Sequence, residues 1–133
     1  VYYAVTDAEP STTPAEAARR IIRGVLHREV PETWTPALNT VMHWGYGTSW
    51  GAVYGVVRGS VRDGGPGRVL AHGLAFGALV WSTSLVHLPA MGLAPPVWRY
   101  APSELAPDLG FHLVYGLGAA TGHAALERWR AST

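Results

Sequence analysis

Cysteine and lysine are both absent from this 133-residue sequence, and few of its residues are charged. Without cysteine, the chain has no disulfide, thiolate zinc site, iron–sulfur cluster or cysteine nucleophile. Its ten arginines nearly balance nine acidic residues, so the net charge of +1 gives no reason to expect nucleic acid as a partner. A GxSxG elbow, a Walker loop and a pair of buried carboxylates are also missing, so we expect a protein that is not an enzyme.

Charged residues are spaced so that three long segments contain none, namely residues 37–57, 69–98 and 109–126. A helix of about 20 apolar residues crosses the hydrocarbon core of a membrane. The alternative is a soluble bundle, but its helices would carry a polar stripe, and residues 69–89 have no charged face. The sequence therefore predicts an all-α integral membrane bundle over residues 36–130, with three spans at about 37–57, 69–89 and 108–127.

Residues 1–35 are expected to form an extramembrane N-terminal segment with an amphipathic helix over residues 14–28. Thr13, Pro14 and Glu16 have the order of a helix cap, a first-turn proline and a capping-box acid. This helix has an apolar face and an arginine rim, so it either lies on anionic lipid or docks on the bundle or a partner subunit. The residues expected at the lipid interface are Arg19, Arg20, Arg23, Trp34, Trp98 and Trp129.

Glycines recur at every fourth position in the predicted spans, as in a glycine zipper, so each set lies along one face of its helix. Small residues at this spacing let two helix backbones approach closely, and in lipid such packing supplies much of the association between helices. These faces either pack the helices of one chain together or join the chain to another. The expected packing positions are Gly47, Gly51, Gly55 and Gly59 in the first span, Gly73 and Gly77 in the second, and Gly118 and Gly122 in the third.

Three histidines, His43, His87 and His112, are expected at one depth of an antiparallel bundle and facing inward. Neutral imidazole binds metal ions, haem iron or the magnesium of a chlorophyll-type pigment, and it relays protons near neutral pH. Because the HxH and HExxH spacings are absent, no metal site is assigned, and hydrogen-bonded packing is the alternative role. His72 and His123 are expected together near the opposite face.

Two segments, residues 87–96 and 108–116, resemble the YagU-like family of bacterial inner-membrane proteins. The matching motif residues are Pro89, Met91, Gly92, Leu93, Pro95, Pro96 and His112, whereas His43 and His87 have no clear counterparts. The resemblance implies a multi-span inner-membrane protein of unassigned biochemical function, usually with a further hydrophobic segment near its N-terminus. Residues 1–5 are typical of the tail of such a segment, which would make four spans.

Arginine is concentrated in the loop 58–68 and near the C-terminus, while residues 90–107 carry only Arg99 as a basic residue. The positive-inside rule therefore predicts a cytoplasmic C-terminus. We expect a membrane protein that acts by assembly, as an accessory or scaffold subunit, with lipids and other membrane subunits or a second copy as partners. The alternatives are a small transporter or proton conductor that uses the three histidines, and a haem-, metal- or pigment-binding module.

Overall fold

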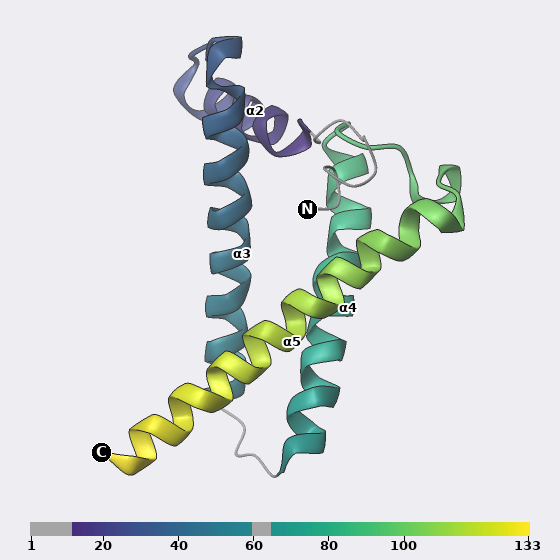
Figure 1. Ribbon diagram of the computed structural model, residues 1–133. Coiled ribbons are helices and arrows are strands. Elements are labelled where there is room, and N and C mark those ends of the chain that lie inside the picture. Colours follow the sequence, from purple (N-terminus) through teal and green to yellow (C-terminus); the bar gives the residue numbers. More distant parts are fainter. Residues whose placement is uncertain (1–11, 60–64) are drawn as a thin grey trace. The chain divides into compact units, whose positions relative to one another are not determined.

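The computed structural model describes residues 12–59 and 65–133, and all regular structure in these two ranges is helical, as the sequence predicts (Figure 1). These residues belong to two compact units, one within residues 1–47 and the other within 48–133, so the boundary falls inside a helix. The helices are α2 (Thr13–Leu26), α3 (Thr35–Gly59), α4 (Pro66–Ala90) and α5 (Pro102–Ser132), with 3-10 turns η1 (Glu32–Trp34) and η2 (Val97–Arg99).

Only one of the three predicted spans is long and apolar enough to cross a membrane, and this helix is Gly67–Ala90 within α4. In its most apolar window, 22% of the residues are buried, so α4 is not an enclosed core helix of this chain. Glycine, serine and threonine lower the hydropathy of α3, and α5 has an acidic first turn and a basic last turn. A bundle of three spans therefore stays a prediction.

The helix α2 is shorter at its end than the predicted range 14–28, because His27 adopts a left-handed conformation with φ of 53°. The His27 N–H donates a hydrogen bond to the Arg23 carbonyl oxygen at 3.1 Å, which closes the last turn. At the other end, the Ala15 N–H donates to Asn39 Oδ1 at 2.8 Å. A side chain of α3 thus satisfies one of the free N–H groups in the first turn of α2.

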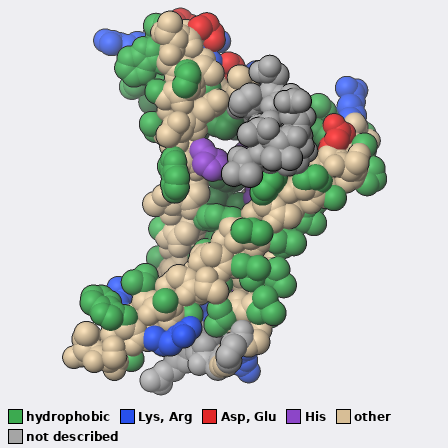
Figure 2. Space-filling model, in the orientation of Figure 1, with side chains coloured by type: hydrophobic (Ala, Val, Ile, Leu, Met, Phe, Trp, Pro, Cys, Tyr) green, Lys and Arg blue, Asp and Glu red, His purple; other side chains and the backbone are tan. Residues whose placement is uncertain are grey.

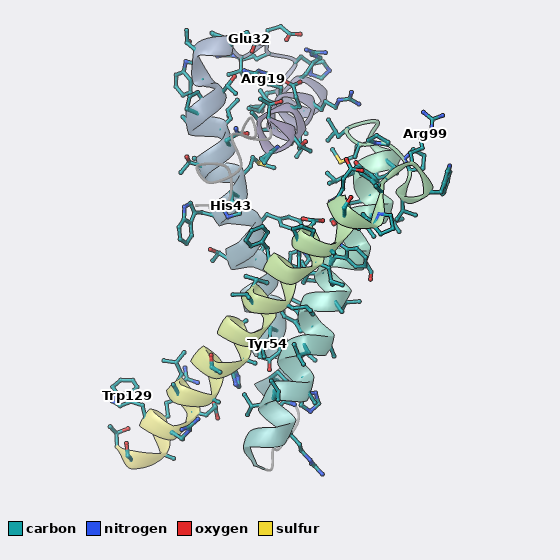
Figure 3. All side chains as sticks on the ribbon, turned by 45° about the vertical axis from the view of Figure 1, so that its right-hand side comes forward. Arg19, Glu32, His43, Tyr54, Arg99 and Trp129 are labelled. Carbon is teal, nitrogen blue, oxygen red and sulfur yellow. The ribbon has the colours of Figure 1, made fainter. Side chains whose placement is uncertain are left out.

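Arg19 is buried, so the predicted lipid-interface position for this residue is wrong. Its side chain is 6% exposed and its Nη1 lies 2.8 Å from Glu16 Oε1. Its Nη2 lies 3.3 Å from Glu32 Oε2 and donates to Thr35 Oγ1 at 2.6 Å (Figure 3). Three alanines of α2, Ala15, Ala17 and Ala18, are also buried, whereas the apolar residues Ile21, Val25 and Leu26 are exposed.

The helices α4 and α5 cross at their glycines (Figure 1). A methyl group on Gly116 would lie 2.6 Å from Gly77 N and 2.8 Å from Gly77 Cα. A methyl group on Gly77 would lie 2.9 Å from Leu113 Cα. Backbone faces backbone at this crossing, so only glycine fits at either position.

The packed face of α5 differs from the face that the sequence analysis selected. No described atom lies within 4 Å of a methyl group placed on Gly118 or Gly122, whereas Gly116 and Ala120 are buried. Two residues correspond to about 200° around a helix, so Gly118 points away from the face that holds Gly116. Within the chain, the packing assignment of Gly118 and Gly122 is therefore corrected to Gly116 and Ala120.

The helix α5 begins at Pro102, six residues before the predicted start at 108. Pro102 occupies the first turn, and Glu104 Oε2 accepts a hydrogen bond from the Ala101 N–H at 2.7 Å. These two features begin the helix upstream of Pro107. Pro107 is the sixth residue of α5 and lies inside the helix, where it removes one intrahelical hydrogen bond.

Candidate functional site

An aromatic cluster occupies the space between the second half of α3 and the crossed pair α4 and α5. Phe76 lies at its centre, with ring centroids of Tyr54 at 4.8 Å, Tyr115 at 6.0 Å and Trp50 at 6.2 Å. These distances are typical of favourable aromatic pairs. Because rings rather than glycines separate α3 from α4, the two helices leave space between them.

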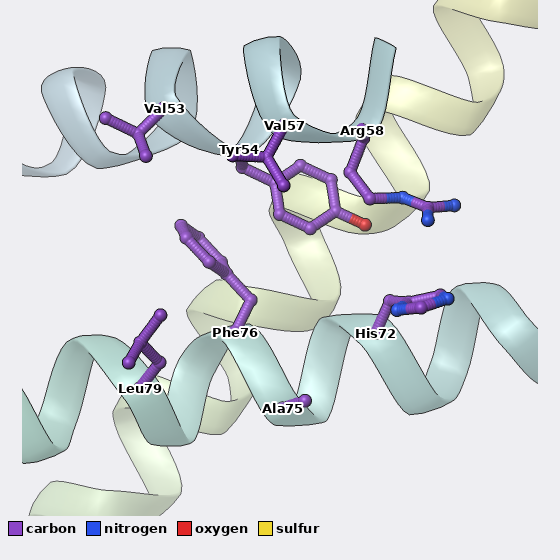
Figure 4. A pocket seen from close by; sticks show the side chains of 8 residues that line it. All are labelled: Val53, Tyr54, Val57, Arg58, His72, Ala75, Phe76 and Leu79. Carbon is purple, nitrogen blue, oxygen red and sulfur yellow. The ribbon is translucent and has the colours of Figure 1, made fainter. Parts of the chain in front are cut away.

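That space contains a pocket of about 230 Å³, lined by residues 53–58 of α3 and 72–79 of α4 (Figure 4). Most of its wall is apolar, from the side chains of Val53, Val57, Ala75, Phe76 and Leu79. No described residue in the lining is acidic.

The polar groups of the pocket gather at one end, where Arg58 of α3 faces His72 of α4 (Figure 4). The Arg58 side chain is 8% exposed. Tyr54 directs its hydroxyl towards the same end (Figure 4). A guanidinium group, an imidazole ring and a phenol therefore lie together beside an apolar wall.

Sequence reasoning missed this site. Arg58 was counted only as one of several loop arginines that set the orientation of the chain. Tyr54 and Arg58 are four residues apart and so share a face of α3, which is the one signal that could have pointed to the site.

His72 and His123 both lie beside Tyr54. The His123 ring is 5.9 Å from the Tyr54 ring, and His72 lines the same pocket as Tyr54. The structure thus gathers these two histidines around one residue of α3, at the end where the sequence places them together.

A second polar cluster joins α4 to α5. Trp81 Nε1 donates a hydrogen bond to Asp108 Oδ2 at 3.0 Å. His112 Nδ1 lies 2.8 Å from the Asp108 carbonyl oxygen and 3.6 Å from Asp108 Oδ1. An acid, an imidazole and an indole are therefore linked across two helices.

The three histidines of the predicted cluster are placed differently from one another. His112 is bonded to Asp108, His87 is half-buried near the end of α4, and His43 is exposed. His43 also belongs to the other compact unit. Among the described residues, no group of three or more His, Cys, Asp or Glu side chains is arranged to hold a metal ion.

Gly73 packs closely as predicted, since a methyl group on it would lie 3.1 Å from Gly116 O and from Leu117 Cα. The other predicted packing and interface residues lie on the surface or at looser contacts. A methyl group on Gly51 would meet Tyr115 Oη at 3.7 Å, and one on Gly55 would meet His123 Cδ2 at 3.9 Å. Gly59 has no described atom within 4 Å of such a methyl, and Gly47 lies in the other unit. The predicted interface residues other than Arg19 are exposed: Arg20, Arg23, Trp34, Trp98 and Trp129.

The proline- and glycine-rich motif that carries the family resemblance forms the end of α4. Gly92 has a positive φ of 66°, and the Leu93 N–H donates to the Leu88 carbonyl oxygen at 2.9 Å. The Gly92 N–H donates to the Pro89 carbonyl oxygen at 2.9 Å. This is a glycine-terminated helix end, so the motif has a structural role in this chain.

No family model, curated protein or solved structure matches the chain. The resemblance to the YagU-like family therefore stays a prediction, and the functional argument depends on the geometry described above.

Proposed function

We propose that this chain is a small integral membrane protein with three spans, which acts by assembly as an accessory or scaffold subunit of a larger membrane complex. The observation that carries the proposal is the exposure of large apolar side chains along all three long helices. Val56 of α3 is 74% exposed, Val86 of α4 is 71% exposed and Val114 of α5 is 69% exposed. Figure 2 shows hydrophobic side chains along the visible surface of α5.

The described chain buries little apolar surface of its own. Only seven hydrophobic residues there are buried, and four of them are alanines. In water, an apolar surface of this extent is costly and leads to association. Lipid tails and neighbouring membrane helices remove that cost.

The lengths of the helices match a membrane. The helices α3 and α4 each contain 25 residues and α5 contains 31. At 1.5 Å per residue, each is at least about 37 Å long, which exceeds a hydrocarbon core of about 30 Å. The high glycine content of α3 is compatible with a span that is shielded by neighbouring helices rather than by lipid alone.

The proposed location is a bacterial inner membrane, with the C-terminus in the cytoplasm. Arg58 and Arg68 lie at the ends of α3 and α4 that the connecting loop joins, and Arg128 and Arg130 lie in the last turns of α5. In an up–down–up threading, all four reach the same membrane face, which the positive-inside rule places in the cytoplasm.

Fractionation followed by native mass spectrometry tests this proposal. We expect the protein in the membrane pellet after ultracentrifugation and, after gentle detergent extraction, in an assembly of defined mass with other subunits. Recovery in the supernatant contradicts the membrane proposal. A bare monomer from the membrane contradicts the subunit role.

Proton conduction is a second candidate, and the linked side chains of Trp81, Asp108 and His112 favour it. An acid and an imidazole side by side at a helix–helix contact resemble one step of a proton relay. Proton flux into liposomes that contain the protein, and its loss in Asp108→Asn, would support this candidate. Flux equal to that of empty liposomes would remove it.

A further inference from the structure

The helix α2 is held against the start of α3 by two hydrogen bonds. The Ala15 N–H donates to Asn39 Oδ1 at 2.8 Å, and Arg19 Nη2 donates to Thr35 Oγ1 at 2.6 Å. The helix α2 runs across the first turns of α3 rather than along them (Figure 1, Figure 3). Both bonds therefore attach α2 to the first two turns of α3.

This attachment fixes the depth of α2 in a membrane that α3 spans. The helix α3 has 25 residues and is about 37 Å long, against a hydrocarbon core of about 30 Å. Its first turns therefore lie at the boundary between lipid headgroups and acyl chains. Because α2 runs across these turns, α2 lies in the plane of that boundary.

Large apolar side chains of α2 are exposed at this depth. Ile21 and Val25 are four residues apart, so they share one face of the helix. Val25 is 70% exposed and follows Arg19 by six residues, which corresponds to about 120° around the helix. Val25 therefore lies away from the side that Arg19 attaches to α3. Leu26, in the last turn, is exposed as well.

The side of α2 opposite to Ile21 and Val25 is charged. Arg23 is two residues from each of them, which places it about 200° around the helix from Ile21. Its Nε lies 2.8 Å from Glu29 Oε1, and both side chains are mostly exposed. A helix with an apolar side and a charged side suits the interface of a membrane, where one side meets acyl chains and the other meets headgroups and water.

The size of the apolar face favours lipid over a protein partner. A stable protein interface buries about 800 Å² on each partner, and three aliphatic side chains supply only part of that area. Acyl chains cover a small apolar face without a partner of matching shape. The membrane is also already adjacent to α2 if α3 is a span.

We infer that α2 is an interfacial helix of the membrane that the chain spans, with Ile21, Val25 and Leu26 inserted at the acyl boundary. This inference rests on the proposed membrane location. It adds an in-plane contact with the bilayer surface to the contacts made by the spanning helices.

Single cysteines test the inference, because the native chain has none. The full-length variants Val25→Cys and Arg23→Cys are labelled with the environment-sensitive fluorophore NBD and reconstituted into vesicles of phosphatidylethanolamine and phosphatidylglycerol. We expect lipids with a nitroxide on the acyl chain to quench the label at position 25 at least about twofold more than the label at position 23. Iodide in the water is expected to show the opposite order.

Arg23→Cys is the matched control because it lies on the same turn of α2 and loses only an exposed ion pair, which contributes little to stability. Ile21→Cys repeats the measurement on the apolar face, one turn before Val25, and the same strong acyl quenching is expected there. Circular dichroism shows whether each labelled variant keeps its helices, so Ile21→Cys keeps the inference testable if Val25→Cys does not fold.

Two outcomes overturn the inference. Equal acyl quenching at positions 23 and 25 would mean that α2 does not insert one face into the lipid. Protection of position 25 from both the acyl nitroxide and iodide would mean that protein covers this face, from a second copy or from the chain itself. Both outcomes concern protein that floats with the vesicles, whereas failure of the membrane proposal leaves the protein unable to float with them.

Discussion

Arg19 and Arg58 are the two arginines that the described fold buries, and their surroundings differ. Arg19 lies between the carboxylates of Glu16 and Glu32, so its charge is balanced within the chain. Arg58 lies at the end of a pocket whose described lining has no carboxylate. The first arginine therefore serves docking of α2 on α3, whereas the second forms the polar end of a mostly apolar pocket.

Replacing Arg19 with alanine is expected to loosen α2. The substitution removes hydrogen bonds to Glu16 and Thr35, which lowers the stability of the docked helix by about 1–3 kcal/mol. Hydrogen exchange of the α2 amides measures this effect, and faster exchange is expected. The control Arg28→Ala changes an exposed arginine just after the same helix and should leave the exchange rates unchanged. Equal rates in both variants would show that the ion pairs do not hold α2.

Trp81→Phe is expected to weaken the contact between α4 and α5. It removes the donor to Asp108 and leaves most of the ring volume in place, so the expected loss is about 1–2 kcal/mol. Thermal unfolding in detergent measures it. Trp129→Phe provides the matched control because Trp129 is exposed near the C-terminus (Figure 3). The account of this hydrogen bond is wrong if the two variants melt at the same temperature.

At the scale of the helix, the α4–α5 crossing is the tightest contact described, and it depends on backbone meeting backbone. Gly77→Ala would place a methyl group 2.9 Å from Leu113 Cα, and neither helix can move its own main chain out of the way cheaply. We expect a loss of at least about 2 kcal/mol, measured as a lower unfolding temperature in detergent.

The matched substitution Gly118→Ala places its methyl where no described atom lies within 4 Å. Alanine favours a helix over glycine by about 1 kcal/mol, so this variant is expected to be neutral or more stable. Loss of stability in Gly118→Ala and none in Gly77→Ala would reverse the assignment of the packed face.

The sequence predicts the helices more reliably than the faces they use. Uncharged length and proline positions place α3 and α4 within a few residues, because those signals are local. The start of α5 was missed because Pro107 and Asp108 look like a helix start, although Pro102 and Glu104 provide an earlier one. The packed face of α5 was missed because small residues occupy several of its faces, and periodicity alone does not select among them.

For the candidate sites too, the sequence predicts local properties better than contacts between helices. The hydrogen bond from Trp81 to Asp108 joins two helices, so no local signal in the sequence predicts it. The pocket at Arg58 depends on how far aromatic rings hold α3 from α4, which is a tertiary property with no local signal. The prediction that grouped His43, His87 and His112 placed all three at one depth and facing inward. His43 is exposed instead.

At the scale of the whole molecule, the exposed apolar surface is the main support for the proposed membrane location. Nineteen large hydrophobic residues are exposed in the described chain, and the proposed membrane location explains them together. The arginines at one set of helix ends then fix the orientation of the chain. The proposed assembly role follows from this location.

The absence of cysteine allows a direct test of the topology in bacterial cells. Three variants each carry a single cysteine: Gly67→Cys at the start of α4, Ala101→Cys just before α5, and Ser132→Cys at the end of α5. Intact cells that contain each variant are treated with a membrane-impermeant maleimide. The account predicts labelling at position 101 alone, with positions 67 and 132 labelled only after the membrane is opened. Labelling at position 101 that is no stronger than at positions 67 and 132 in intact cells would contradict the membrane location.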